Sequence, residues 1–226
     1  MVHKPRMSAS EAKRRIEWQN KGYRKHLESN ERITVDFNGL KLVVLPNVFV
    51  PVPWDYNLLS KTVLKEVELA DKVLDMGTGT GVQAILAASK STDVTAVDVN
   101  PFAVKCAKLN SELNNVSSRV RVNQSDLFEN VTEKFDVIIF DPPFRWSKPR
   151  DVWERSSADE NYVTMKGFFS QAKNYLKPNG RLLIHFGTSG DLSNLKQIIR
   201  KNGYKRRQIL TINKCGWSYF TFRLTL

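Results

Sequence analysis

The sequence predicts a doubly wound α/β fold, in which a mostly parallel sheet carries helices on both faces. From residue 72 to residue 201, short apolar runs typical of buried strands alternate with amphipathic segments typical of helices. This alternation is typical of parallel sheets, because each crossover helix returns the chain to the same edge. The chain then ends in two alternating segments, 204–213 and 217–226, joined by a short turn. They predict an antiparallel hairpin at one edge of the sheet.

The composition fits one folded domain with a short extension. The chain has 226 residues, of which 41% are hydrophobic. No apolar run approaches the roughly 18 residues that suggest a membrane helix, and the N-terminus lacks the apolar stretch of a secretory signal. Cys106 and Cys215 have no metal-binding or redox spacing. They predict unpaired thiols and a cytoplasmic protein.

The charge is strongly positive. Lys and Arg number 35 and Asp and Glu number 23, a net charge of +12. Such a surplus favours polyanionic partners, nucleic acid above all, although it is also compatible with a simple solubility effect.

Residues 1–32 form a basic extension before the domain of residues 33–226. Ser8 and Glu11 have the spacing of a capping box, followed by a thin apolar stripe at helical spacing. The predicted helix is either a basic arm for RNA or a solvated helix that lies on the domain.

Residues 33–54 form a leading hairpin and a connector. Two alternating runs flank Asn38-Gly39, a strong signal for a two-residue hairpin turn. The apolar spacing of residues 55–70 then predicts a helix.

The remaining elements follow in order. Strands are predicted at 72–77, 93–99, 119–124, 135–140 and 179–187, and helices at 81–90, 101–113, 162–176 and 192–201. Pro101 suits a first helical turn.

Ligands of such sheets bind outside the carboxyl ends of the strands, so the last residues of each strand are informative. The first strand ends in Asp75 and leads into a glycine-rich turn, residues 77–81, which lets a ligand approach the backbone. The second ends at Asp98, which can accept hydrogen bonds from both hydroxyls of a ribose. Asp126, after the third strand, can accept from an adenine amino group. These residues indicate a nucleoside ligand.

The glycine pattern argues against NAD. It is G-x-G-x-G with an acid just before it, whereas the dinucleotide fingerprint is G-x-G-x-x-G. The carboxylate of Asp75 would repel a pyrophosphate and would suit a ligand with an ammonium group.

Four segments together resemble the motifs of class I S-adenosylmethionine-dependent methyltransferases, in order and spacing. They are LDMGTGTG, AVDVNPFAVKCAKLN, NQSDLF and FDVIIFDPPF. The nearest resemblance is to the small-domain and HemK-like branch of amino-methylating enzymes, which also has a hairpin and a proline-containing segment like LPNVFVPVPWD before the domain. The resemblance covers residues 40–190 and implies a Rossmann-like, seven-stranded sheet.

The resemblance also implies S-adenosylmethionine as cofactor and assigns residues to it. The implied contacts are with the methionine part, the ribose and the adenine, and they come from Asp75, Gly77, Thr78, Gly79, Gly81, Asp98, Val99, Asp126 and Leu127.

The run Asp141-Pro142-Pro143-Phe144 carries the predicted chemistry. The implied target is an amine conjugated to a ring or a carbonyl, whose lone pair is delocalised. Hydrogen bonds to the Asp141 side chain and the Pro142 carbonyl would favour a pyramidal nitrogen, the prolines stiffen the backbone, and Phe144 can stack on a flat target. The methyl group of a sulfonium is already activated, so placement and electrostatic support suffice.

The acceptor stays open at this point. The glutamine-amide methyltransferases of the family, which act on release factors, have Asn-Pro-Pro-Tyr, whereas Asp in the first position is familiar in enzymes acting on base amines. The leading expectation is an exocyclic base amine in RNA. The alternatives are a glutamine amide of a release factor, a small-molecule amine, or a subunit that holds the cofactor without turnover.

The segment after Phe144 interleaves cations with aromatics, which suits a strand of RNA or a solvated lid loop. The residues are Arg145, Trp146, Lys148, Arg150, Trp153 and Arg155. His185, in a predicted buried strand, is interpreted as structural rather than catalytic. No cluster of His, Cys and Asp suggests a metal.

Overall fold

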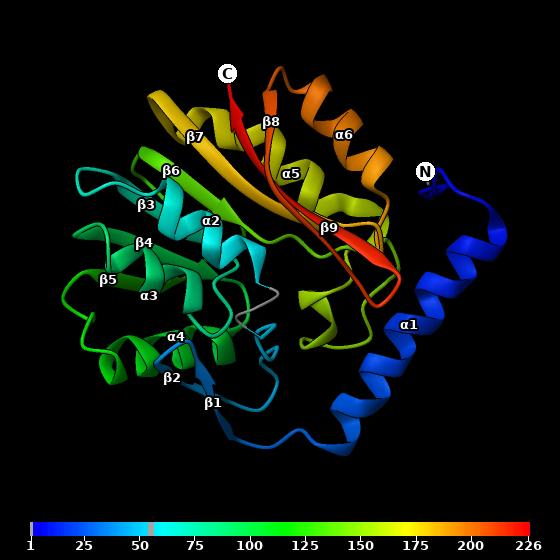
Figure 1. Ribbon diagram of the computed structural model, residues 1–226, viewed down its shortest axis with the longest axis horizontal. Helices are drawn as coiled ribbons and strands as arrows, with labels where there is room; N and C mark the ends of the chain where they lie inside the picture. The colour runs from blue at the N-terminus through cyan, green and yellow to red at the C-terminus, as the bar shows by residue number, and fades with distance from the viewer. Residues whose placement is uncertain (1, 54–56) are drawn as a thin grey trace.

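The computed structural model describes residues 2–53 and 57–226 and has the predicted α/β architecture (Figure 1). A seven-stranded sheet has the strand order β5-β4-β3-β6-β7-β9-β8. Neighbours from β5 to β7 run parallel, and β9 is antiparallel to both β7 and β8. The predicted fold class, including the antiparallel C-terminal hairpin, is therefore confirmed.

The strands of this sheet lie close to their predicted positions. They are β3 (Lys72–Met76), β4 (Asp93–Asp98), β5 (Val120–Gln124), β6 (Phe135–Phe140), β7 (Leu176–Gly187), β8 (Lys205–Lys214) and β9 (Trp217–Thr225). β7 begins three residues earlier than predicted, because Leu176 pairs with Phe135 across an irregularity in the register.

A separate two-stranded hairpin precedes the sheet. β1 (Ile33–Phe37) pairs antiparallel with β2 (Leu40–Val44). Asn38 and Gly39 both have positive φ, 55° and 83°, as a two-residue hairpin turn requires. The predicted turn is confirmed.

Helices cover both faces of the sheet. One face carries α2 (Leu58–Glu66), α3 (Val82–Ala88) and α4 (Pro101–Leu113); the other carries α5 (Val163–Gln171) and α6 (Leu192–Lys201). The predicted helix at 55–70 is shorter, and its expected start lies outside the described residues. The predicted helix at 162–176 continues as a 3₁₀ turn over Ala172–Tyr175.

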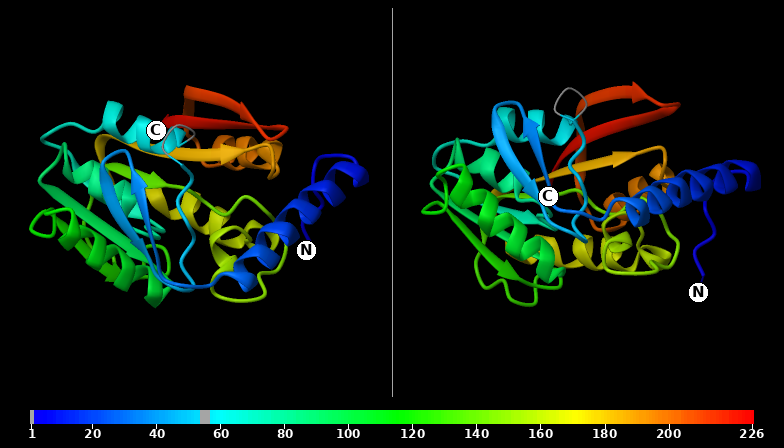
Figure 2. Two further views of the ribbon diagram at one scale, coloured as in Figure 1. Left: turned by 60° about the horizontal axis from the view of Figure 1, so that its bottom comes forward. Right: turned by 90° about the horizontal axis from the view of Figure 1, so that it is seen from below.

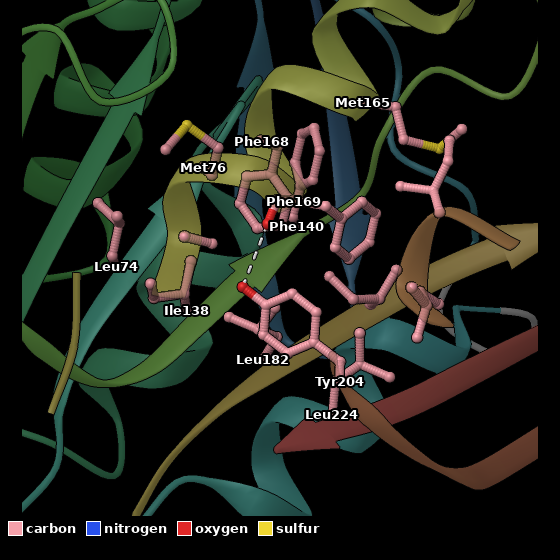
Figure 3. Packing of buried hydrophobic residues seen from close by; sticks show 14 of the residues in the cluster. Leu74, Met76, Ile138, Phe140, Met165, Phe168, Phe169, Leu182, Tyr204 and Leu224 are labelled. Carbon is pink, nitrogen blue, oxygen red and sulfur yellow. Dashed lines mark hydrogen bonds between the residues drawn. The ribbon is translucent and has the colours of Figure 1, made fainter. Parts of the chain in front are cut away.

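The side chains of each strand alternate between two cores. Leu74, Ile138 and Leu182 contribute to an aromatic-rich core beneath α5 and α6 (Figure 3). Tyr204 is buried in that core, and its hydroxyl donates to the carbonyl of Phe169 at 3.4 Å, the dashed line in Figure 3. This packing fixes the carboxyl ends of the central strands, where the site lies.

The N-terminal helix α1 (Ala9–Glu28) lies against the domain (Figures 1 and 2). The predicted capping box is present, since Ser8 accepts from the Glu11 amide and Glu11 accepts from the Ser8 amide. No helix in the described part of the chain is long and apolar enough to cross a membrane.

Candidate active site

β3 and β6 are neighbours at the topological switch point of the sheet, where the chain stops adding strands on one side and begins to add them on the other. From β3 the chain proceeds to β4 and β5 on one side, and it returns to β6 on the other. In register, Met76 pairs with Phe140, so the residues that follow these two strands emerge side by side. A cavity of about 970 Å³ opens here. This is the position at which open α/β sheets bind ligands.

The glycine turn after β3 forms one wall of the cavity. Gly77, Gly79 and Gly81 all have positive φ, which favours glycine. A Cβ at Gly81 would lie 3.0 Å from the Cα of Ala107, so this glycine allows close packing of α4. Nothing lies within 4 Å of a Cβ position at Gly79, which lines the cavity and leaves room for a ligand.

Asp75 is buried beneath this turn. Its Oδ2 accepts from the Thr78 hydroxyl at 2.6 Å and from the Ala84 amide at 3.1 Å. Burial raises the pKa of Asp75 to about 7. Asp75 and Gly81 do not line the cavity among the described residues, whereas Gly77, Thr78 and Gly79 do. Asp75 therefore holds the turn, and the expected direct approach to a ligand ammonium group is not what the geometry provides.

Asp98 lies at the end of β4 and lines the cavity. Its Oδ2 accepts from the Gly79 amide and its Oδ1 from the Asn100 amide, both at 2.9 Å. Burial raises its pKa. Because each oxygen has a second lone pair, the side chain can also accept two hydroxyl groups of a ribose.

Val99, Asp126 and Leu127 complete this side of the cavity. Leu127 has a positive φ of 48° in the turn after β5. Asp126 is about half exposed and lies 3.8 Å from the Arg155 guanidinium. The predicted cofactor residues other than Asp75 and Gly81 thus surround one space.

The Asp-Pro-Pro-Phe run forms the opposite wall. All four residues line the cavity. The Phe144 ring packs against Phe186 at 4.7 Å between centroids, and the Phe144 carbonyl accepts from the Tyr162 hydroxyl at 2.7 Å. The backbone at Gly190 passes very close to Phe144. Only glycine fits there, since a Cβ at position 190 would lie 2.1 Å from the Phe144 carbonyl oxygen.

His185 contacts Asp141 directly. Its Nδ1 lies 3.1 Å from Oδ1 of Asp141, and its Nε2 is buried without a hydrogen-bond partner in the described structure. The sequence alone favours a structural role for His185, because a lone histidine in an apolar strand carries no signal of its partner. The signal lay in the register: Ile184 pairs with Phe140, so the next residues of β6 and β7 are neighbours.

The segment after Phe144 packs on α1. Trp153 is 9% exposed and stacks on His26 with ring centroids 4.0 Å apart. Arg150 forms an ion pair with the buried Glu154, which also accepts from Gln19 at 2.7 Å. Trp153 and the Arg150–Glu154 pair are thus engaged with α1, whereas the side chains of Lys148, Arg150 and Arg155 are exposed.

The comparisons with known proteins agree with this geometry. The family model of the methyltransferase small domain matches residues 39–202. A Methanocaldococcus jannaschii protein provisionally named protein N5-glutamine methyltransferase is 38% identical over 177 residues, 74% of this chain and 84% of the relative.

Two further matches are more distant. The release factor glutamine methyltransferase of Shewanella oneidensis is 32% identical over 67% of this chain, and the match spans only 57% of that protein. The crystal structure of the ribosomal protein L11 methylase of Lactobacillus delbrueckii superposes with a TM-score of 0.59 at 18% identity, covering 84% of this chain and 97% of that one.

The cavity fits the cofactor of this family. The open space at Gly79 admits a ligand against the backbone, and Asp98 presents acceptors for a ribose. Among residues 2–53 and 57–226, no group of three or more His, Cys, Asp and Glu side chains is arranged to hold a metal ion. The chain belongs to the methyltransferase small-domain family and is a class I methyltransferase that uses S-adenosylmethionine.

Proposed function

We propose that this chain methylates the side-chain amide of a glutamine in a protein acceptor. The observation that carries the proposal is the Asp141 carboxylate, which lines the cavity beside the stiff Pro142-Pro143 segment and is hydrogen-bonded to His185. The names of the relatives, which refer to glutamine methylation, support this choice among planar amines.

The chemistry needs an acceptor for the N–H groups of the target. The nitrogen lone pair of an amide is delocalised into its carbonyl, so the nitrogen is a poor nucleophile. Hydrogen bonds from its N–H groups to Asp141 and to the Pro142 carbonyl would favour a pyramidal nitrogen with an available lone pair. Because a carboxylate oxygen accepts as the oxygen of Asn does, Asp in this position is compatible with an amide target.

The charge of the cavity also favours a protein acceptor. Its described lining has five acids, Asp98, Asp126, Asp141, Asp159 and Glu160, against three cations, Arg145, Arg155 and Lys214. The net charge of +12 of the whole chain therefore lies elsewhere. A strand with one negative charge per nucleotide would meet repulsion inside this cavity.

RNA remains a second candidate because of a groove outside the cavity. Arg14, Lys21 and Arg24 of α1 line this groove together with Glu17, Trp18 and Trp217, and its volume is about 490 Å³. Three cations against one acid, with two indole rings, are a combination that suits a nucleic-acid strand.

Transfer of a labelled methyl group to parallel fractions tests the proposal. The purified chain is incubated with labelled S-adenosylmethionine and with release factors, ribosomal proteins, total RNA or small amines. We expect the label in a protein, on glutamine. Asp141→Ala should reduce the transfer at least about a hundredfold, the scale for one lost transition-state contact. Label confined to RNA or to a small amine would reject the glutamine proposal.

A further inference from the structure

Among the residues that the structure describes, Arg145 has no countercharge at the wall of the cavity. It follows Phe144 directly and lines the same space as Asp141. Its Nε is out of contact with solvent and has no hydrogen-bond partner. Within the described residues, its guanidinium makes neither a hydrogen bond nor an ion pair, whereas Arg150 and Arg155 each have a carboxylate within 4.0 Å.

The surroundings of Arg145 do not neutralise it. Burial lowers the pKa of Arg145, and the charges of Tyr219, Tyr162 and Glu154 act in the opposite direction. Burial raises the pKa of both tyrosines, so these phenols are neutral at pH 7. Glu154 is already paired with Arg150 and hydrogen-bonded to Gln19. An unpaired cation in such a place is unfavourable unless a ligand supplies the anion.

The backbone holds Arg145 in this position. Its amide donates to the Ser157 carbonyl at 3.1 Å, and its own carbonyl accepts from the Asp159 amide at 2.8 Å. These two bonds fix the backbone from which the guanidinium extends. Such preorganisation suits a binding residue, because little flexibility is lost when the ligand arrives.

We propose that Arg145 binds a carboxylate of the acceptor protein, from an Asp or Glu close to the methylated residue. This assignment rests on the proposed glutamine methylation. Arg145 belongs to the acceptor side because it continues the Asp-Pro-Pro-Phe wall, whereas the glycine turn and Asp98 form the cofactor side. The planar guanidinium binds a single carboxylate through two parallel hydrogen bonds. One carboxylate is tolerated in an acid-lined cavity where a polyanion is not.

Stability measurements test the free protein without any acceptor. Arg145→Met removes the charge and keeps an unbranched side chain, so its thermal midpoint should be equal to or above that of the wild type. Arg150→Met is the matched control, and its midpoint should fall because it leaves Glu154 buried without its cation. A comparable fall for Arg145→Met would show that Arg145 has a structural partner, and would overturn the proposal.

Binding measurements test the ligand class. The probes are blocked tripeptides with the sequences Glu-Gln-Glu, Gln-Gln-Gln and Lys-Gln-Lys, titrated in the presence of S-adenosylhomocysteine. We expect the wild type to bind Glu-Gln-Glu at least about tenfold more tightly than Gln-Gln-Gln, the usual scale of a charge-assisted hydrogen bond, and Arg145→Met to lose this preference. No preference in the wild type would overturn the carboxylate subsite.

Two controls separate this proposal from its alternatives. If Arg145→Met weakens the binding of S-adenosylhomocysteine itself, Arg145 holds the carboxylate of the cofactor and the proposal fails. If Arg145 instead governs the affinity for a short oligoribonucleotide more strongly than that for Glu-Gln-Glu, the anion is a phosphate and the proposal fails. Neither the stability measurement nor the peptide titration requires methyl transfer. A failure of the proposed glutamine methylation can therefore be distinguished from a failure of the Arg145 proposal.

Discussion

Asp141 and His185 are joined by a hydrogen bond of 3.1 Å across the carboxyl ends of β6 and β7. It is the only hydrogen bond of the His185 ring in the described part of the chain, because Nε2 has no partner. The imidazole also lies edge-on to the Phe144 ring, with 5.4 Å between centroids, and its hydrogen bond can orient the Asp141 carboxylate toward the cavity. With Nδ1 as the donor, one oxygen of Asp141 is engaged and the other is available to an acceptor amine.

Replacing His185 tests this positioning role. His185→Phe should lower the kcat of methyl transfer about tenfold or more, because a hydrogen bond to a charged group contributes about 1.5–3 kcal/mol. The affinity for S-adenosylmethionine should not change. His185→Asn, which can place a donor near the Nδ1 position, should recover part of the rate. Equal rates for the wild type and both variants would contradict the role.

Asp98 should dominate the affinity for the cofactor ribose. Asp98→Ala should weaken the binding of S-adenosylmethionine by about 1.5–3 kcal/mol, the range for hydrogen bonds that involve a charged group. Titration calorimetry measures the effect, and Asp36→Ala, at an exposed position of β1, is the control. Wild-type protein that bound NAD as well as S-adenosylmethionine would refute the cofactor assignment.

Many features of the fold depend on residues that are close together in the sequence. The β1–β2 turn, the glycine turn and the cap at Ser8 were predictable, because each depends on residues within a few positions of one another. The mostly parallel sheet and the antiparallel hairpin at its edge followed from the alternation of strands and helices. All of these features reappear in the structure.

Features that depend on distant contacts were missed. The pairing of His185 with Asp141 spans 44 positions, and that of Gln19 with Glu154 spans 135. No periodicity or motif encodes such pairs. For the same reason Trp153 seemed available to a ligand in the sequence, although α1 covers it in the structure. The basic character of α1 was visible, whereas its buried side chains were not.

Asp75 should make stability depend on pH. Its pKa is raised to about 7 in the folded protein by burial, above its ordinary value of 3.8. The folded state therefore binds the proton more tightly than the unfolded chain, so stability falls as the pH rises from about 4 to about 7, by at most about 1.4 kcal/mol per pH unit. Asp75→Asn keeps an oxygen that can accept from Thr78 and Ala84. Denaturation at several pH values should find this variant more stable than the wild type at pH 8, with a difference that shrinks toward pH 5. A difference independent of pH would contradict the raised pKa.

Gln19 should couple α1 to the segment after Phe144. It is 7% exposed, its Nε2 donates to Glu154 at 2.7 Å, and its Oε1 accepts from the Ser147 hydroxyl at 3.1 Å. Gln19→Ala should destabilise the protein by about 1–3 kcal/mol, because it leaves a buried carboxylate with one partner fewer. Hydrogen exchange should quicken in residues 145–162, and the KM for the acceptor should rise while cofactor affinity is kept. Lys13→Ala, on the exposed side of α1, should change none of these. If both variants behaved like the wild type, α1 would be an independent basic arm, as an RNA-binding extension would be, and its contacts with the domain would carry no function.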